Sequence, residues 1–341
     1  AIENKINKFY FKKQMEKEND IKYMRRAIEL ARHGMGNASP NPMVGAVIVC
    51  DGEIIGEGYH RRCGEGHAEV NAVASVKKRD LLTRSTIYVT LEPCSHYGKT
   101  PPCSKLIIDT GIPRVVVGSL DPFAKVSGRG IKMLTDAGID VTVGILEEEC
   151  KAINPVFMTA HSKHRPYITL KWAQSSDGFI DRLRNNSEEP AKLSTPLTFT
   201  LSHRLRTLND AIMAGRGTVI ADNPSLTPRR WKGKAPVRVI AATPEKLPAD
   251  SKILNDGNET IILDSSESHD LHAMMENLYS KGITSVLVEG GAKLLQSFID
   301  QGLWDRARVE VSPLKLNNGV KAPALAAIPQ RMLTIQGNRL F

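Results

Sequence analysis

The sequence predicts two α/β domains joined in one chain. Its 341 residues exceed what one hydrophobic core usually organises, so two domains are the default expectation. In both halves, short runs rich in valine and isoleucine alternate with segments of helical periodicity, a pattern typical of sheets covered by helices. Pro166 marks the boundary, because the residue before a proline disfavours helix. We therefore expect a flexible N-terminal extension over residues 1–19 and domains over residues 20–163 and 164–341.

Composition argues against a membrane protein and against a secreted protein held by disulfides. No uninterrupted apolar run approaches the roughly 18 residues that a membrane span needs, and the charged N-terminal stretch lacks the apolar core of a signal peptide. The five cysteines are an odd number in a long chain, which indicates free or metal-bound thiols rather than a disulfide framework. We expect a cytoplasmic protein without a membrane partner.

The formal net charge of +9 is compatible with two kinds of partner. A basic face could bind nucleic acid, or basic pockets could bind small phosphorylated ligands. Part of the excess lies within the first 13 residues, and the rest is spread along the chain without a stripe of lysine and arginine interleaved with aromatic residues. This distribution favours phosphorylated small molecules and argues against nucleic acid.

The first half starts with a helix near residues 21–34, whose apolar residues recur at helical spacing and which Gly34 terminates. Residues 44–59 predict two strands joined at Asp51 and Gly52, a dipeptide that favours tight hairpins. A further helix is expected near residues 147–163. Between them, helices and strands alternate over residues 67–78, 85–94, 103–111, 114–120, 128–138 and 139–146. The alternation predicts a three-layer α/β domain.

The second half repeats this alternation, without an internal repeat or a low-complexity segment. Helices are expected near residues 194–209, 269–281 and 292–302. Strands are expected over residues 167–173, 210–215, 237–242, 259–264, 285–291 and 306–313. No G-x-G-x-x-G motif follows the first strand of either half, so a dinucleotide-binding fold of that type is not expected.

A candidate metal site combines one imidazole with two thiols. His67, Cys94 and Cys103 offer the nitrogen and sulfur donors that zinc binds readily, and three protein ligands leave the fourth tetrahedral position open for water. Glu69 lies two residues after His67, where its carboxylate can take a proton from that water without binding the metal. Cys103 is expected to open a helix, whose positive end favours a thiolate.

The order of these residues is informative. H-x-E followed by P-C and a second cysteine is the zinc deaminase signature, here with eight residues between the cysteines instead of two. Taken singly, each of these side chains is more often an ordinary packed residue than a ligand. Together they stand in the right order at the predicted edges of strands and helices, which favours a zinc-dependent deaminase.

Two alternatives have a different function. The first is a nucleic-acid or nucleoside deaminase, acting on a flipped or unpaired base, with an accessory second domain that is not a reductase. It requires an electrostatic track and stacking aromatic side chains, whereas aromatic residues make up only 5% of this chain. The second alternative is a fusion in which only the deaminase half is active.

Longer motifs surround the deaminase signature, and further, different motifs lie in the second half. They are SPNPMVGAVIV, GEGYHRRCGEGHAEV, VTLEPCSHYGKTPPC and GRG in the first half, and KWAQSSDG, ADNPSLTPR and VEGGAKL in the second. Through these motifs, over about residues 20–330, the chain resembles the bifunctional riboflavin biosynthesis enzymes, in which a pyrimidine deaminase is fused to a reductase. The resemblance implies a cytidine-deaminase-like three-layer α/β/α domain followed by a dihydrofolate-reductase-like α/β domain.

The resemblance also implies two reactions. The first is the zinc-dependent hydrolytic deamination of 2,5-diamino-6-ribosylamino-4(3H)-pyrimidinone 5′-phosphate, which releases ammonia. The second is the NADPH-dependent reduction of the ribosyl side chain to a ribityl chain. The implied cofactors are Zn²⁺ and NADPH, the implied partners are phosphorylated pyrimidines, and the implied assembly is a homo-oligomer, either a dimer or a tetramer.

Site residues of the first domain follow from the motif positions. The resemblance implies that zinc is held by the three donors named above and that Glu69 moves the proton. It adds Asn41 and His60 as substrate contacts. Judged from the residues alone, Asn41 could equally be a turn residue between two prolines, and His60 a solvated residue at the end of a strand.

Site residues of the second domain follow in the same way. The resemblance implies substrate contacts by Arg206, Leu226, Arg229 and Glu289. The planar fork of arginine binds phosphate bidentately, although a single arginine is more often part of a solvated helix face. The implied cofactor contacts are Ala173, Thr218, Asp222, Gly291, Ala292, Lys293, Leu294, Leu295, Gln296 and Ser297.

The last seven of these residues lie in a glycine turn and the start of a helix, an arrangement that can bind a phosphate. A Gly-Gly pair after a strand is by itself a weak signal, because it usually marks an ordinary turn.

The chain departs from the family pattern at three places. The reductase family commonly carries a tryptophan in the stretch that corresponds to residues 187–196, and none is present here. Arg216 stands where the family has smaller residues, and we expect it to meet the 2′-phosphate of NADPH. A last strand near residues 333–341 is expected to be short or absent.

Replacing Arg216 with alanine tests the second departure. If the guanidinium meets the 2′-phosphate, the variant should raise the KM for NADPH several-fold and leave the KM for NADH nearly unchanged, because only NADPH carries that group. Steady-state kinetics with both cofactors measure the difference. An equal change in the two KM values would contradict the assignment.

Overall fold

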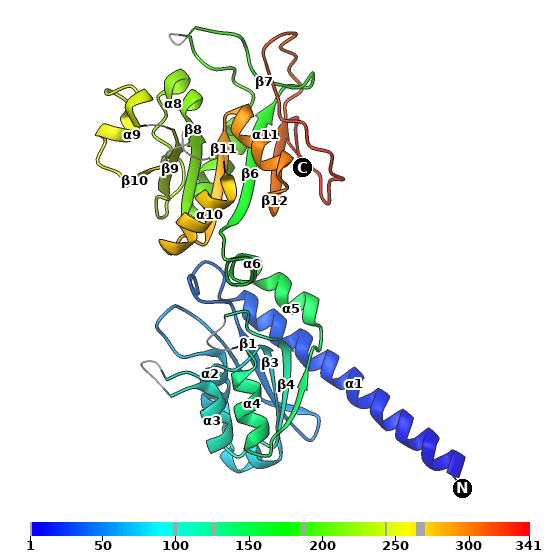
Figure 1. Cartoon of the computed structure of the whole chain (residues 1–341). Helices are drawn as coiled ribbons and strands as arrows, with labels where there is room; N and C mark the ends of the chain where they lie inside the picture. The colour runs from blue at the N-terminus through cyan, green and yellow to red at the C-terminus, as the bar shows by residue number, and fades with distance from the viewer. Residues whose placement is uncertain (1, 98–100, 124–126, 186–187, 243, 264–269) are drawn as a thin grey trace. The chain divides into compact units, whose positions relative to one another are not determined.

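The computed structural model describes residues 2–97, 101–123, 127–185, 188–242, 244–263 and 270–341. The chain divides into two compact units, Ala1–Ser162 and Lys163–Phe341. Each unit contains a β-sheet with helices packed against it (Figure 1). Among the described residues, no helix combines the length and the apolar character needed to cross a membrane.

The sheet of the first unit has five strands in the order β2-β1-β3-β4-β5. The first two strands form the predicted antiparallel hairpin, in which Asp51 and Gly52 both adopt positive φ angles, as a tight hairpin turn requires. The remaining strands run parallel to one another. The strands are β1 (Gly45–Cys50), β2 (Glu53–Tyr59), β3 (Thr86–Leu91), β4 (Arg114–Ser119) and β5 (Asp140–Val143).

Helices cover both faces of this sheet and complete three layers. Alternate strand residues face opposite sides, so that Val47 packs with α1 and α5 while Ile48 packs with α2, α3 and α4. The helices are α1 (Ile2–Arg32), α2 (Ala68–Ser75), α3 (Cys103–Asp109), α4 (Arg129–Asp136) and α5 (Glu147–Ile153), with a short 3-10 helix, η1 (Arg79–Arg84), before β3. The predicted three-layer domain is confirmed.

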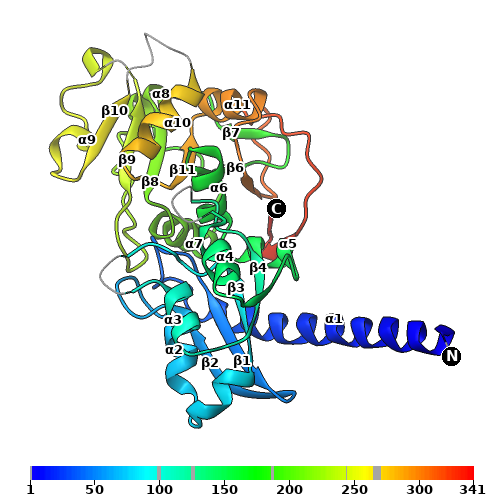
Figure 2. The same cartoon turned by 60° about the horizontal axis from the view of Figure 1, so that its bottom comes forward.

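The first helix is longer than the sequence predicted. It begins at Ile2, so the residues expected to form an extension before the domain are helical, and Figure 2 shows this part of α1 reaching beyond the sheet of its unit. Asp20 is the first buried residue of the helix among those whose side chains are described. Its carboxylate accepts hydrogen bonds from the Tyr88 hydroxyl at 3.0 Å and from both terminal nitrogens of Arg114 at 2.9 and 2.8 Å. Glu16, one turn earlier and exposed, forms an ion pair with Arg114 at 3.5 Å, so among the described side chains the buried part of the helix starts at Asp20, just before the apolar periodicity.

A second correction concerns residues 147–163, predicted as one helix. The structure has two helices, because α5 ends at Ile153 and α6 (Pro155–Lys163) starts at Pro155. Proline lacks the N–H that would continue the first helix, and it suits the first position of a new one.

The second unit contains an eight-stranded sheet in the order β10-β9-β8-β11-β6-β12-β15-β14. Its first six strands are parallel and match the six predicted segments: β6 (Tyr167–Gln174), β8 (Ala211–Gly215), β9 (Val237–Ala241), β10 (Thr260–Leu263), β11 (Ser285–Gly290) and β12 (Arg306–Val311). The last hairpin, β14 (Leu333–Ile335) and β15 (Asn338–Leu340), adds an antiparallel edge. The last strand is short, as expected, and β7 (Phe179–Asp181) pairs with β13 (Val320–Lys321) in a separate ribbon.

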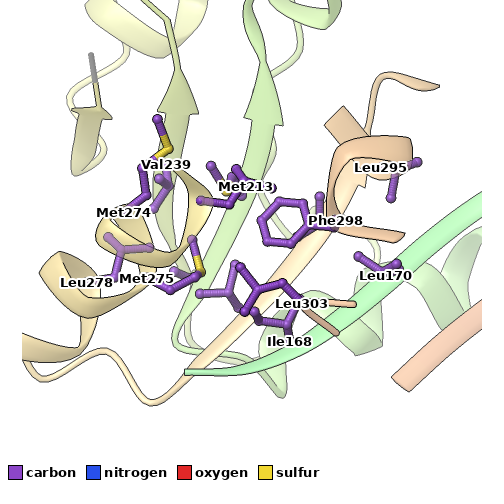
Figure 3. Packing of buried hydrophobic residues seen from close by; sticks show 14 of the residues in the cluster. Ile168, Leu170, Met213, Val239, Met274, Met275, Leu278, Leu295, Phe298 and Leu303 are labelled. Atoms are coloured by element: carbon purple, nitrogen blue, oxygen red, sulfur yellow. The ribbon is translucent and has the colours of Figure 1, made fainter. Parts of the chain in front are cut away.

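The predicted helices of this unit cover the two faces of the sheet. On one face, α10 (Leu271–Ser280) and α11 (Ala292–Asp300) pack on buried strand residues such as Leu170 and Met213, with Phe298 at the centre (Figure 3). On the other face lie α7 (Pro196–Thr207), α8 (Arg216–Asp222) and α9 (Lys252–Asn255), together with η2 (Pro244–Lys246). The sequence did not predict α8 and α9, because helices of seven and four residues show too little periodicity.

Candidate active sites

Three predicted metal donors meet at the ends of a strand and two helices of the first unit. His67 directly precedes α2, Cys94 follows β3, and Cys103 is the first residue of α3. The Nδ1 atom of His67 lies 3.6 Å from the sulfur of Cys94 and 3.3 Å from that of Cys103. The three donor atoms all lie within 4.8 Å of one another. A tetrahedral zinc ion requires about 3.5 Å between its nitrogen and sulfur ligands, so the geometry fits this metal.

The start of α3 holds the two cysteines together. The backbone N–H of Cys103 donates to the sulfur of Cys94 at 3.3 Å. Ser104 donates its backbone N–H and its hydroxyl to the carbonyl of Cys94, at 3.2 and 2.9 Å. Hydrogen bonding from the Cys103 side chain is the largest of the effects that lower the pKa of the Cys94 thiol to about 4. Cys94 is therefore available as a thiolate, the form that binds metals. The middle of the spacer, residues 98–100, lies outside the described residues.

Glu69 lies beside the donor group without belonging to it. It is the second residue of α2 and is only 3% exposed. Burial, and then the neighbouring Cys94, raise the pKa of its carboxyl to about 7. A bound cation would lower this pKa again, because it favours the carboxylate. A buried carboxyl group beside the donor group is placed to accept a proton and to donate one, as acid–base catalysis requires.

The two predicted substrate residues of this unit lie together. Asn41 Nδ2 is 3.2 Å from His60 Nε2, and His60 Nδ1 is 3.3 Å from the carbonyl oxygen of Gly66. The carbonyl can only accept, so Nδ1 carries the proton and Nε2 accepts from the amide. Burial lowers the pKa of His60, consistent with this neutral ring. The ring centre of His60 lies 5.5 Å from that of His67, which places the pair next to the donor group.

The sequence analysis missed Glu92, a buried residue two positions before Cys94. One carboxylate oxygen accepts from the backbone N–H groups of Gly130 and Ile131, at 2.9 and 3.3 Å. The other accepts from those of Gly128 and Asp121, at 3.0 and 3.3 Å. Glu92 thus ties the loop before α4 to the segment that carries Cys94. The order Glu-Pro-Cys was visible in the sequence, but the sequence did not show which backbone N–H groups would donate to the Glu92 carboxylate.

In the second unit, the predicted substrate residues Arg206 and Glu289 form an ion pair. Arg206 Nε and Nη2 donate to the two carboxylate oxygens of Glu289 at 2.9 and 2.7 Å, and Nη1 donates to the carbonyl of Thr227 at 3.0 Å. Arg229 donates to the Ser225 hydroxyl at 2.7 Å. The loop after α8 therefore carries Arg229 and the buried Leu226, and its Thr227 contacts Arg206 directly.

The predicted cofactor residues gather around the turn between β11 and α11. A Cβ atom placed on Gly291 would lie 3.3 Å from the hydroxyl oxygen of Thr218, and one on Gly290 would lie 3.7 Å from it. Thr218 on α8 thus faces the start of α11, whose first turns contain residues 292–297. Ala173 lies on β6, in the strand next to β11.

The sequence analysis connected three further places with the cofactor: Asp222, Arg216 and the stretch that lacks the family tryptophan. Asp222 ends α8 and forms an ion pair with Arg184. Arg216 is exposed at the start of α8 and has no ion pair with a described residue. In the stretch without the family tryptophan, Leu193 is buried, and its carbonyl accepts a hydrogen bond from the Asn338 side chain at 2.8 Å.

Lys171 is a second residue that the sequence analysis did not single out. It stands on β6, where Leu170 pairs with Val288 of β11 and Lys171 pairs with Arg308 of β12. Burial is the largest effect on its ammonium group and lowers its pKa. The signal was available, because a lysine inside the apolar run YITLKWA is unusual for a central strand.

Two protein-family models match the chain in succession. The cytidine and deoxycytidylate deaminase zinc-binding region matches residues 17–119, and the RibD C-terminal domain matches residues 166–326. The chain is 38% identical to the riboflavin biosynthesis protein RibD of Actinobacillus pleuropneumoniae, over 89% of this chain and 86% of that protein. It is 39% identical to RibD of Aquifex aeolicus, over 90% of each. The chain belongs to the RibD family.

A solved structure agrees with this assignment over both units. It is a diaminohydroxyphosphoribosylaminopyrimidine deaminase/5-amino-6-(5-phosphoribosylamino)uracil reductase from Thermotoga maritima, 36% identical, with a TM-score of 0.77 over 95% of this chain and 98% of that one. The expected fold class is confirmed as a cytidine-deaminase-like domain followed by a RibD reductase domain.

The family membership decides between the functional alternatives. The chain is a bifunctional deaminase and reductase of riboflavin biosynthesis, with a zinc-binding deaminase half and a reductase half of the kind that uses NADPH. Its substrates are small pyrimidine molecules of that pathway. A deaminase with an accessory domain that is not a reductase is excluded, because the second half matches the RibD reductase model.

Replacing Glu92 with alanine should destabilise the first unit by about 3 kcal/mol, because four backbone N–H groups lose a charged acceptor. Chemical unfolding followed by circular dichroism measures the loss. Glu148→Ala, which removes an 84% exposed carboxylate of α5, is the control and should change the stability little. A Glu92 variant as stable as this control would contradict the role assigned to the carboxylate.

Proposed function

We propose that His67, Cys94 and Cys103 hold the zinc ion of the deaminase and that Glu69 transfers the protons. The substrate is 2,5-diamino-6-ribosylamino-4(3H)-pyrimidinone 5′-phosphate, and the products are ammonia and the corresponding pyrimidinedione. The convergence of one imidazole nitrogen and two sulfurs within 4.8 Å carries this proposal.

The chain's own residues then have separate tasks in the deamination. Zinc held by this ligand set supplies a water molecule whose pKa is lowered towards neutrality. Glu69 accepts a proton from that water and later donates a proton to the departing amino group. Asn41 offers its amide oxygen and its second amide N–H to the polar edge of the pyrimidine, and the neutral His60 holds that amide in place. Burial of Glu69 keeps bulk water from competing for its proton.

For the reductase, we propose that NADPH lies along Ala173, Thr218, Asp222 and the start of α11. The substrate then lies against Arg206, Leu226, Arg229 and Glu289. Arg206 uses three of its five N–H groups for Glu289 and Thr227, which leaves two for the substrate. The first turn of α11, with Gly291 before it, offers backbone N–H groups to a phosphate of the cofactor.

Lys171 completes the reductase proposal. Reduction breaks the bond between C1′ and the ring oxygen of the ribosyl group: a hydride from NADPH goes to C1′, a proton goes to the ring oxygen, and NADP⁺ is released. Lys171 donates that proton, supported by its place beside Glu289 and by the burial that lowers its pKa and so eases proton release.

We also propose a homo-oligomer that forms along the edge of β12. This strand pairs with β15 only at Glu310 and Val311, so the described part of the chain provides no strand partner for residues 306–308 on that side. A groove of about 1040 Å³ lies along this edge, and apolar residues such as Trp304 and Leu333 line it together with Ile328, which is 92% exposed. Open edges and exposed apolar groups favour pairing with another chain. We also propose a cytoplasmic location, because none of the five cysteines forms a disulfide.

Glu69→Gln tests the deaminase assignment. Ammonia release should fall by about 10²- to 10⁴-fold, because the amide cannot accept the proton, while zinc stays bound at one ion per chain. Elemental analysis and an ammonia assay measure the two quantities, and Glu53→Gln, at an exposed position of β2, is the matched control. Loss of zinc together with activity would place Glu69 among the ligands and contradict the proposal.

Lys171→Met tests the reductase assignment. NADPH oxidation with the deaminated substrate should fall at least about 10²-fold, because the methionine keeps the shape of the side chain and removes the proton donor. The decay of NADPH absorbance measures the rate. Ammonia release by the same variant should stay at the wild-type level, since that site lies in the other unit. If this variant reduces substrate at the wild-type rate, Lys171 is not the acid.

Ile328→Asp tests the oligomer. Light scattering coupled to size exclusion should give a multiple of 37.5 kDa for the wild type and a monomer mass for the variant, because a buried aspartate would oppose association. Ile54→Asp, which changes a 41% exposed residue of β2, should keep the wild-type mass. A monomeric wild type at all concentrations would refute this part of the proposal.

A further inference from the structure

A buried carboxylate on β12 has no role in the reactions described above. Glu310 is only 2% exposed. It accepts hydrogen bonds from the Ser194 hydroxyl, just before α7, at 2.7 Å and from the Thr198 hydroxyl, in the first turn of α7, at 2.6 Å. It also accepts one from the Asn338 amide of β15 at 2.5 Å. All three partners are neutral. Among the described residues, no cation lies within ion-pair distance of this carboxylate.

The strand register places Glu310 on the same side of the sheet as Lys171. In the parallel pair of β6 and β12, Lys171 lies opposite Arg308 and Ala173 lies opposite Glu310. Residues two positions apart on a strand share a face, so Glu310 is the diagonal neighbour of Lys171. Neighbouring strands lie about 4.8 Å apart and two residues span about 6.6 Å, so the two positions are roughly 8 Å apart. That is close enough for electrostatic coupling in a poorly solvated interior.

Four charged groups face Lys171 from the elements packed around it. They are Glu289 from β11, Arg206 from α7, and Arg308 and Glu310 from β12. Glu289 and Arg206 are bound to each other through two hydrogen bonds, so their charges largely offset. Arg308 disfavours a second cation beside it. Glu310 is therefore the carboxylate whose charge is not already matched by a bonded cation.

We propose that Glu310 is a positioning residue of the reductase, which keeps Lys171 in the ammonium form that donates the proton to the ribosyl ring oxygen. The proposal rests on the role given to Lys171 above. Glu310 exchanges no proton itself: Lys171 passes from ammonium to amine as the ring oxygen is protonated and the hydride reaches C1′. The three neutral donors fix the carboxylate without cancelling its charge, which a bonded cation would do.

The test is the pH dependence of kcat/KM for NADPH oxidation in Glu310→Gln. The protonated lysine is the active form, so activity is lost as the pH rises through the pKa of Lys171. Removing a nearby negative charge lowers that pKa. The alkaline limb of the profile should therefore move to lower pH, by on the order of one unit, with little change on its acid side. At pH values above the limb, the rate falls by about tenfold.

Two further variants make the test specific. Glu310→Asp keeps the negative charge but moves it one methylene further from Lys171. The alkaline limb of its pH profile should therefore move in the same direction as in Glu310→Gln, by a smaller amount. This variant decides the question if Glu310→Gln does not fold. Glu276→Gln, at an exposed position of α10 in the same unit, should leave the limb in place. Ammonia release should be unaffected in all three.

The outcomes separate this proposal from the one on which it rests. If Glu310→Gln folds and its alkaline limb does not move, the role of Glu310 is overturned, even where Lys171→Met is inactive. If Glu310→Gln does not fold, an unmoved alkaline limb in Glu310→Asp overturns that role instead. Full reductase activity of Lys171→Met overturns the role of Lys171 and this inference with it. A limb that moves down in both Glu310 variants and stays in place in the control supports the inference.

Discussion

Three donor atoms from distant parts of the sequence must meet around one ion, and the first unit is arranged to bring them together. His67 and Cys103 stand at the starts of α2 and α3, while Cys94 stands just past the end of β3. Their donor atoms lie at the spacing that a tetrahedral ion imposes. Strand and helix ends are suited to this purpose, because their backbone is fixed by the sheet while their side chains are free to converge.

The surroundings of the donor group are fixed by hydrogen bonds rather than by apolar packing alone. The start of α3 anchors the Cys94 segment on one side, through Ser104. Glu92 anchors the same segment on the other side, by accepting two backbone N–H groups from the loop before α4 and two from the first turn of α4. A buried carboxylate with this many donors is well satisfied, so it adds rigidity without the cost of an unpaired charge. The reductase uses the same device at Glu310, where neutral donors hold a carboxylate among charged neighbours.

The sequence predicted those parts of the molecule that depend on local pattern. The hairpin at Asp51 and Gly52, the other strands of the first sheet, the six parallel strands of the second and the three metal donors follow from spacing and turn chemistry. Two local features were misjudged: the first helix already starts at Ile2, and the helix before Pro166 breaks at Pro155. Features that depend on distant partners could not be predicted from local pattern. Glu92, Lys171 and Glu310 acquire their surroundings only through strand register and loop placement, which no local pattern reveals.

The central claim is that one imidazole and two thiolates bind a single zinc ion, and X-ray absorption at the zinc edge of the purified protein tests it most directly. The account predicts one zinc per chain with two sulfur ligands at about 2.3 Å and nitrogen or oxygen ligands at about 2.0 Å. A protein that retains no zinc after purification in its presence, or a zinc spectrum without the sulfur shell, would contradict the account.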